Sequence, residues 1–254
     1  MSTVDINGIS LNYEKKGKQG RDVILLHGWG QNIEMMDFIA EFLKDHFVVY
    51  NIDLPGFGKS SEPSEPWDSE DYTRFLHDFC IKKKISDPIF IAHSFGCRIA
   101  LRYAYHYGAY KMVLTGAAGI RDKHGLVWHA KTYSYKLGKK ILSLKAFEQY
   151  AEALKKNAGS EDYRNASGVM RNTLVKVVNE DITPILSEIS AETLLVFGEN
   201  DEATPVEKGK LMEQLMPNSA LVIFENDDHY AYIHQAGRFN LVLDAFLRSD
   251  YDKR

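Results

Sequence analysis

Segments with the hydrophobic pattern of strands alternate along this chain with segments that have the hydrophobic spacing of helices. Apolar residues first alternate on both sides of Asn7-Gly8, a dipeptide typical of tight hairpin turns. Short apolar runs then predict buried strands, and stretches with apolar residues three or four positions apart predict helices. The predicted strands cover 23–26, 47–52, 88–92, 112–115, 193–197 and 220–224. The predicted helices cover 34–43, 68–83, 95–107, 205–215 and 233–247. This alternation favours an α/β fold with a mostly parallel central sheet flanked by helices.

The alternation stops near residue 120 and resumes near residue 186. Residues 120–185 contain no strand-like run, and their apolar spacing predicts helices over 127–142, 144–156 and 161–178. A helical block inserted after a sheet strand lies above the carboxyl ends of the strands, where α/β proteins bind their ligands. We therefore expect a core formed by 1–119 and 186–254, and an inserted helical lid formed by 120–185.

The predicted lid is basic. Residues 121–176 contain 12 Lys and Arg against 5 Asp and Glu, so their net charge is 12 − 5 = +7. Such a charge either attracts acidic substrates or belongs to a solvated outer helix face, which is the interpretation we favour. Aromatic side chains of the lid either line a pocket or, as we favour for most of them, pack lid helices together. They are Trp128, Tyr133, Tyr135, Phe147 and Tyr150.

Composition narrows the classes of partner. The 254 residues are 44% hydrophobic, enough for a large core, and a net charge of −4 with a pI near 6.1 argues against a nucleic-acid partner. The sequence shows no apolar run near the roughly 20 residues that span a bilayer, and no signal-peptide pattern, so we expect no membrane partner. Cys80 and Cys97 form no metal or redox motif, and we expect a cytoplasmic protein.

Ser94 has the sequence context of a nucleophile. It stands between the predicted strand 88–92 and the helix that starts at residue 95, with the small residues Ala92 and Gly96 on either side. A strand that turns abruptly into a helix holds such a serine in a strained conformation and exposes its hydroxyl. The context predicts a catalytic serine at the carboxyl edge of the sheet.

The chain after Ser94 supplies a base and an acid. His229 follows the predicted strand 220–224, and Asp201 follows the strand 193–197, so both loops leave the same edge of the sheet. A serine needs a base, and the base needs a carboxylate that fixes its tautomer. Asp201 is our candidate for that carboxylate. The alternatives nearby in sequence are Glu199, Glu202, Asp227 and Asp228.

With two further motifs, the chain resembles the α/β-hydrolases over nearly its full length. The motifs are His27-Gly28-Trp29-Gly30 and the loop from Asp53 to Ser60, each placed after a strand. The resemblance implies that the backbone N–H groups of Trp29 and Phe95 form an oxyanion hole. It also implies that His27, Gly28 and Gly30 shape the first loop, and His93 is expected to point away from the nucleophile. Ala92 replaces the family's usual glycine, and Cys97 stands where a second glycine often follows.

The resemblance implies a serine hydrolase that cleaves an ester-like bond of a small molecule through an acyl-enzyme on Ser94. No metal or nucleotide cofactor is expected. Gly56 to Ser60 resembles the end of a phosphate-binding loop, but Asp53 occupies the position of its first glycine. No histidine–carboxylate group with zinc spacing occurs in the sequence.

Other activities stay open at this point. Carbon–carbon bond hydrolases and aminopeptidases use the same triad, and some proteins of this kind sense a small ligand with little or no hydrolysis. A small-molecule substrate is the expected partner, and self-association into a homo-oligomer stays open.

Overall fold

A computed structural model of the chain describes residues 1–121, 161–251 and 253. The helices predicted over 127–142 and 144–156 lie outside the described residues, and so do the five lid aromatic residues. Those five are Trp128, Tyr133, Tyr135, Phe147 and Tyr150.

Eight strands of the described residues form one sheet in the order β1-β2-β4-β3-β5-β6-β7-β8. The strands are β1 (Ser2–Ile6), β2 (Ile9–Lys16), β3 (Asp22–Leu26), β4 (Val48–Ile52), β5 (Ile89–His93), β6 (Lys111–Thr115), β7 (Glu192–Gly198) and β8 (Ser219–Phe224). The first two run antiparallel to their neighbours, and all pairs from β4 to β8 are parallel. The predicted mostly parallel sheet is confirmed.

The predicted hairpin at the start of the chain forms between β1 and β2. Ile6 pairs with Ile9 across the two turn residues, Asn7 and Gly8. Both turn residues have positive φ, +53° and +84°, which is the geometry that favours Asn-Gly in a two-residue hairpin.

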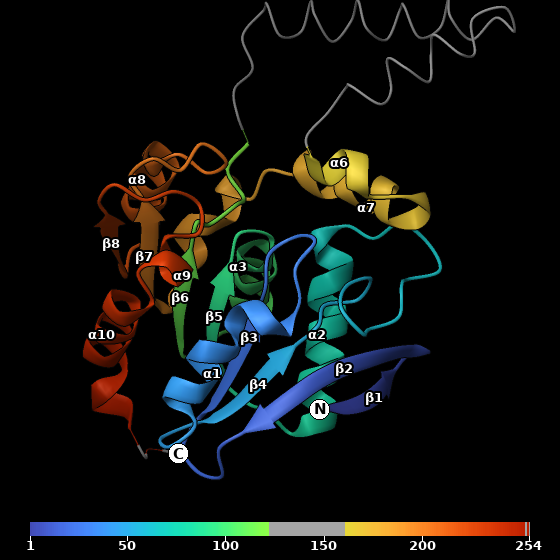
Figure 1. The fold of residues 1–254 in the computed structure, drawn as a ribbon, viewed down its shortest axis with the longest axis horizontal. Helices are drawn as coiled ribbons and strands as arrows, with labels where there is room; N and C mark the ends of the chain where they lie inside the picture. Colours follow the sequence, from blue (N-terminus) through green and yellow to red (C-terminus); the bar gives the residue numbers. More distant parts are fainter. Residues whose placement is uncertain (122–160, 252, 254) are drawn as a thin grey trace, which may run out of the picture.

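Helices cover both faces of the sheet (Figure 1). On one face, α1 (Asp37–Leu43) and α10 (Ala236–Leu247) bury apolar side chains such as Leu43 and Phe239. On the other face, α2 (Ser69–Lys83), α3 (Phe95–Tyr107) and α8 (Val206–Leu215) bury side chains such as Tyr72, Ile99 and Met212. None of the helices in the described ranges is long and apolar enough to cross a bilayer.

Three helices that the sequence predicts as continuous are each divided in two. The segment 34–43 forms the 3-10 helix η1 (Ile33–Met36), whose first turn is capped by the Asn32 side chain, followed by α1. The segment 161–178 forms α6 (Glu161–Asn165) and α7 (Gly168–Val178), since Ser167 is extended and Gly168 has φ +51°. The last helix divides at Gln235 into α9 (Ala231–His234) and α10.

The described end of the predicted lid lies over the carboxyl ends of the strands (Figure 1). It comprises α6 and α7. The 3-10 helix η3 (Thr183–Glu188) follows and packs against α3 and α8, and the 3-10 helix η4 (Arg248–Asp250) follows α10. The hydroxyl of Thr173 accepts the N–H of Trp67 at 3.1 Å, and the carboxylate of Glu180 accepts the N–H of Ser69 at 2.9 Å. These bonds attach α7 and the segment after it to the start of α2.

Candidate active site

Ser94 lies at a strained turn between β5 and α3. Its backbone has φ +48° and ψ −107°, a region that non-glycine residues rarely adopt. A Cβ at Gly96 would lie 2.5 Å from the carbonyl oxygen of Leu26, so only glycine lets α3 start this close to β3. The N–H of Ser94 donates to the carbonyl oxygen of Thr115 at 3.0 Å, which ties the turn to β6. The chain therefore turns sharply from strand to helix at Ser94.

Asp201 and His229 form a hydrogen-bonded pair at the same edge of the sheet. Asp201 follows β7, His229 follows β8, and Oδ2 of the acid lies 2.7 Å from Nδ1 of the imidazole. The Asp201 side chain is fully buried, and 15% of the His229 side chain is exposed. The pair therefore has a covered acid and an imidazole that reaches solvent.

The Asp201 carboxylate is held by further donors. Its Oδ1 accepts the backbone N–H groups of Ala203 and Thr204 at 2.9 and 2.8 Å, and its Oδ2 accepts the Thr204 hydroxyl at 2.7 Å. Burial acts to raise the pKa of Asp201, but the bonds from His229 and Thr204 outweigh it and hold the pKa below its ordinary value. Asp201 is therefore ionised at neutral pH and fixes the proton of His229 on Nδ1.

The neighbouring acids have other partners. Glu199 accepts the N–H of Asn226, and Asp228 accepts the N–H of Tyr230. Asp227 binds the ring of His234 at 2.8 Å. Among the described acids of these loops, Asp201 is the one within hydrogen-bond distance of His229.

His229 lies next to the turn that holds Ser94. The ring of His93, the residue before the serine, lies 4.7 Å from the His229 ring, and the His93 Nδ1 lies 3.2 Å from the Thr115 carbonyl oxygen. Complete burial holds the pKa of His93 well below its ordinary value, so this ring is neutral. The hydrogen bonds of the described residues include none between Ser94 and His229, a contact that is often long until substrate binds.

The loop after β3 is fixed by a buried histidine. Leu54 donates its N–H to Nε2 of His27 at 3.0 Å, so the proton resides on Nδ1, which donates to the Gly28 carbonyl oxygen at 2.7 Å. Burial lowers the pKa of His27 to about 4. Gly28 has no room for a side chain, since its Cβ would lie 2.9 Å from the His93 ring, and Gly30 has φ +72°. All three residues shape the loop that presents Trp29.

The loop from Asp53 to Ser60 is built around a buried carboxylate. Asp53 accepts hydrogen bonds from the side chain of Asn12 and from the backbone N–H groups of Ile33 and Lys59, each at 2.8 Å. A Cβ at Gly58 would lie 2.3 Å from this carboxyl group. The loop whose sequence resembles a phosphate-binding loop is therefore organised around the carboxylate of Asp53.

Two cavities meet at Trp29 and Asp162, which line both. The first, of about 300 Å³, is lined by Ser94 and Phe95. Its other lining residues are Arg98, Ala118, Gly119, Ile120, Arg121, Leu174, Val177, Val178, Asn179, Ala203, Thr204 and Lys208.

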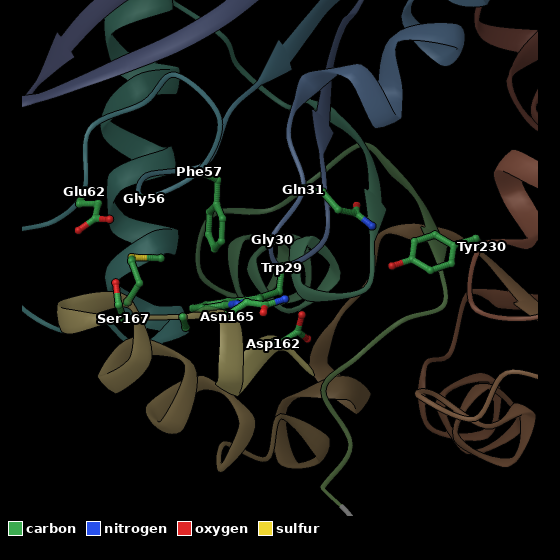
Figure 2. A pocket seen from close by; sticks show the side chains of 12 residues that line it. Trp29, Gly30, Gln31, Gly56, Phe57, Glu62, Asp162, Asn165, Ser167 and Tyr230 are labelled. Atoms are coloured by element: carbon green, nitrogen blue, oxygen red, sulfur yellow. The ribbon is translucent and has the colours of Figure 1, made fainter. Parts of the chain in front are cut away.

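The second cavity has a volume of about 450 Å³. Figure 2 shows Trp29 and Phe57 from the core facing Asp162 and Asn165 of α6 across it. It is also lined by Gly30, Gln31, Gly56, Glu62, Ala166, Ser167, Met170 and Tyr230. Trp29 packs edge-to-face on Phe57 and Phe95, with ring centroids 4.9 and 5.3 Å apart.

Three residues of the site are absent from the sequence-based prediction. Thr204 binds Asp201, Arg98 lines the cavity of Ser94, and Gly116 lies against His229, whose Nδ1 would be 2.9 Å from a Cβ there. A hydroxyl three residues after the acid is a local signal that could have indicated Thr204. The positions of Gly116 and Arg98 depend on how distant segments pack.

One group of described side chains has the spacing of metal ligands. Ligand atoms of Asp227, Asp228 and His234 lie within 4.8 Å of one another. Asp228 and His234 are exposed, and Asp227 already accepts hydrogen bonds from His234 and Gln235. This exposed acidic group lies outside both cavities, and we assign no ion to it.

Comparisons with known proteins show the family of the chain. The chain is 24% identical to the pimeloyl-[acyl-carrier protein] methyl ester esterase of Aliivibrio fischeri, with 94% of this chain and 97% of the relative covered. It is 26% identical to the 2-hydroxy-6-oxo-6-phenylhexa-2,4-dienoate hydrolase of Comamonas testosteroni, over 98% of this chain and 94% of the relative. An esterase structure from Exiguobacterium antarcticum superposes with a TM-score of 0.73 at 22% identity, covering 96% and 97% of the two chains. The family model described as alpha/beta hydrolase family matches residues 23–240, and this chain therefore belongs to that family.

Proposed function

We propose that this chain is a serine hydrolase that cleaves an ester-like bond of a small molecule through an acyl-enzyme on Ser94. The observation that carries the proposal is the strained Ser94 at the cavity wall, with the hydrogen-bonded Asp201–His229 pair next to its turn. The strained Ser94 lines the same cavity as Thr204, whose hydroxyl binds Asp201 and lies 3.2 Å from Nδ1 of His229. The nucleophile thus lines a cavity that a small substrate can enter. Thr204 connects that cavity to the acid and the base, which are not themselves among its lining residues.

In the proposed reaction, His229 takes the hydroxyl proton of Ser94 on Nε2 while Asp201 holds the opposite ring nitrogen. The serine oxygen attacks the carbonyl carbon, and the negative charge develops on the carbonyl oxygen. The backbone N–H groups of Trp29 and Phe95, which both line this cavity, would stabilise that oxygen by about 3 kcal/mol per donor. His229 then protonates the leaving alcohol, and water attacks the acyl-enzyme with His229 again as the base.

The relatives support an ester substrate. Two of the proteins named above are esterases by name. Hydrolysis of a carbon–carbon bond is a second candidate, because the chain is similar to a 2-hydroxy-6-oxo-6-phenylhexa-2,4-dienoate hydrolase. The two candidates differ in substrate, so parallel assays with an ester and a dienoate of that kind distinguish them.

We also propose that residues 120–185 act as a lid. The described part of this segment supports the proposal, since α6 and α7 contribute Asp162, Met170, Leu174 and Val177 to the walls of the two cavities. A lid formed in this way would select substrates by shape at the carboxyl edge of the sheet.

Covalent labelling tests the proposed nucleophile. A fluorophosphonate probe should label the wild-type protein and the variant Ser190→Ala, whose exposed serine lies outside both cavities, but not Ser94→Ala. Hydrolysis of p-nitrophenyl acetate should follow the same pattern, with at least a roughly 10³-fold loss in Ser94→Ala. A wild-type protein that takes no label, or a Ser94→Ala protein that keeps its turnover, would refute the proposal. Labelling without turnover of any ester would instead favour a ligand sensor.

A further inference from the structure

Arg98 is a buried cation in the wall of the cavity that contains Ser94. It lies on α3, four residues and about one helical turn after the serine, and only 8% of it is exposed. Within the described ranges, its guanidinium donates one hydrogen bond, from Nη1 to the carbonyl oxygen of Glu180 at 3.3 Å, and no carboxylate lies within ion-pair distance.

The next arginine on the same helix has a different environment. Arg102 donates to Glu70 at 3.1 Å and lies 3.5 Å from a carboxylate oxygen of Glu180, so its charge is compensated by the protein. Arg102 is not among the residues that line either cavity. The arginine without a close carboxylate is thus the one that faces the cavity of Ser94.

Among the described residues, the guanidinium of Arg98 has one neutral acceptor, and its other nitrogens are not among the buried atoms that lack a partner, so they reach solvent. A guanidinium carries five N–H donors and stays charged in proteins, and a buried charge is tolerated when an opposite charge pairs with it. Burial lowers the pKa of Arg98, an effect that the charge of Glu180 partly offsets. An anion in the cavity would supply acceptors for these nitrogens, and a guanidinium suits the planar oxygens of a carboxylate or those of a phosphate.

The other lining residues fit an anion attached to an apolar stem. Two further cations, Arg121 and Lys208, line this cavity, and Asp162 is the one carboxylate among its described lining residues. Between these charges, the wall is apolar where Leu174 and Val177 of α7 face inward. The formal charge of the lining residues that the structure describes is therefore 3 − 1 = +2.

We propose that Arg98 binds an anionic oxygen group of the substrate, so that the preferred ester carries a carboxylate or phosphate a few bonds from the scissile carbonyl. The inference rests on the proposed esterase function, and it adds the substrate class. Arg98 would act as a specificity-determining residue, since it recognises a remote group and takes no part in the bond-breaking steps.

Matched methyl esters test this inference. Monomethyl adipate and methyl hexanoate differ in one terminal group, a carboxylate against a methyl, and methyl 5-phosphonopentanoate provides the phosphonate arm. We expect the wild-type protein to prefer a charged ester over methyl hexanoate by at least roughly tenfold in kcat/KM. Arg98→Met should lower that preference at least roughly tenfold, and Arg98→Lys should keep part of it. Arg74→Met, which removes an exposed guanidinium outside both cavities, should keep the wild-type preference.

The outcome separates this inference from the proposed function. A wild-type protein that hydrolyses methyl hexanoate as fast as both charged esters overturns the role of Arg98 and leaves the esterase proposal standing. An Arg98→Met protein that loses activity equally on all three esters overturns that role as well. If no ester is hydrolysed, calorimetric titration with adipate still tests the anion site. Adipate binding to the wild-type protein that weakens at least tenfold in Arg98→Met supports the site, and the absence of binding rejects it.

Discussion

Gly116, the residue that follows β6, leaves room for the imidazole of His229. A Cβ at this position would lie 2.9 Å from Nδ1 of His229 and 3.4 Å from Oδ2 of Asp201. Ordinary contacts of a Cβ start near 3.4 Å, so Gly116→Ala must push the ring back by about 3.4 − 2.9 = 0.5 Å. A displacement of about 1 Å in a catalytic group can cost roughly 100-fold in rate, and we therefore expect a loss of roughly tenfold in kcat.

The same substitution also has a backbone cost, which a second glycine can isolate. Gly116 has φ +52°, and alanine in such a conformation costs about 1–2 kcal/mol of folding free energy. Gly108 has φ +80° and ψ 159° at the carboxyl end of α3, a region that is essentially restricted to glycine, with open space around it. Gly108→Ala therefore has a backbone cost without the contact. Urea denaturation should show a loss of stability in both variants.

The assay is the hydrolysis of p-nitrophenyl acetate by the two variants, side by side. Only Gly116→Ala should lose turnover, because only its new methyl group reaches the His229–Asp201 pair. If both variants turn over the ester at the same rate, the position of the imidazole does not limit the reaction, and the assignment of His229 as the base is wrong.

Two further predictions concern buried polar groups near the site. Thr204→Val keeps the shape of the side chain but removes the hydroxyl that donates to Asp201 at 2.7 Å. The free energy of unfolding should therefore fall by about 1 kcal/mol and kcat should fall several-fold, while Thr204→Ser should stay near wild type. Equal kinetics in all three proteins would show that the hydroxyl has no positioning role. His27 takes up a proton near pH 6.5 when unfolded but only near pH 4 when folded, because of its burial. Protons therefore favour the unfolded chain, and stability should fall by roughly 3 kcal/mol from this residue as the pH drops from 6.5 to 4. Urea denaturation at pH 7, 5 and 4 should give a flatter pH dependence for His27→Gln, and an unchanged slope would contradict this source of acid sensitivity.

The periodicity of the sequence predicts the order of strands and helices well but misses where helices divide. The apolar spacing of 161–178 continues across Ser167, although the described side chains of α6 are not buried and α7 buries residues such as Met170 and Leu174. The break itself depends on an extended Ser167 and on φ +51° at Gly168, which periodicity does not register. Local backbone conformation thus sets the ends of these helices, while burial sets their pattern.

The candidate site also contains residues that the sequence indicates and residues that it does not. The candidates Ser94, Asp201 and His229 follow predicted strands, and parallel strands bring their carboxyl ends together, so chain order was sufficient to propose them. Gly116 and Arg98 could not be found in this way. Their roles depend on which side chain lies a few ångströms away, and that follows from the packing of segments far apart in sequence.

The proximity of Gly116 to His229 also has an evolutionary consequence. The ends of β6 and β7 are neighbours in the sheet, and both reach the same imidazole, one through Gly116 and the other through the loop of Asp201. A carboxylate could therefore migrate from one strand end to the next during divergence while the histidine stays in place. An alignment that demands an acid in one column would then overlook active members of the family, whereas a superposition of imidazoles would find them.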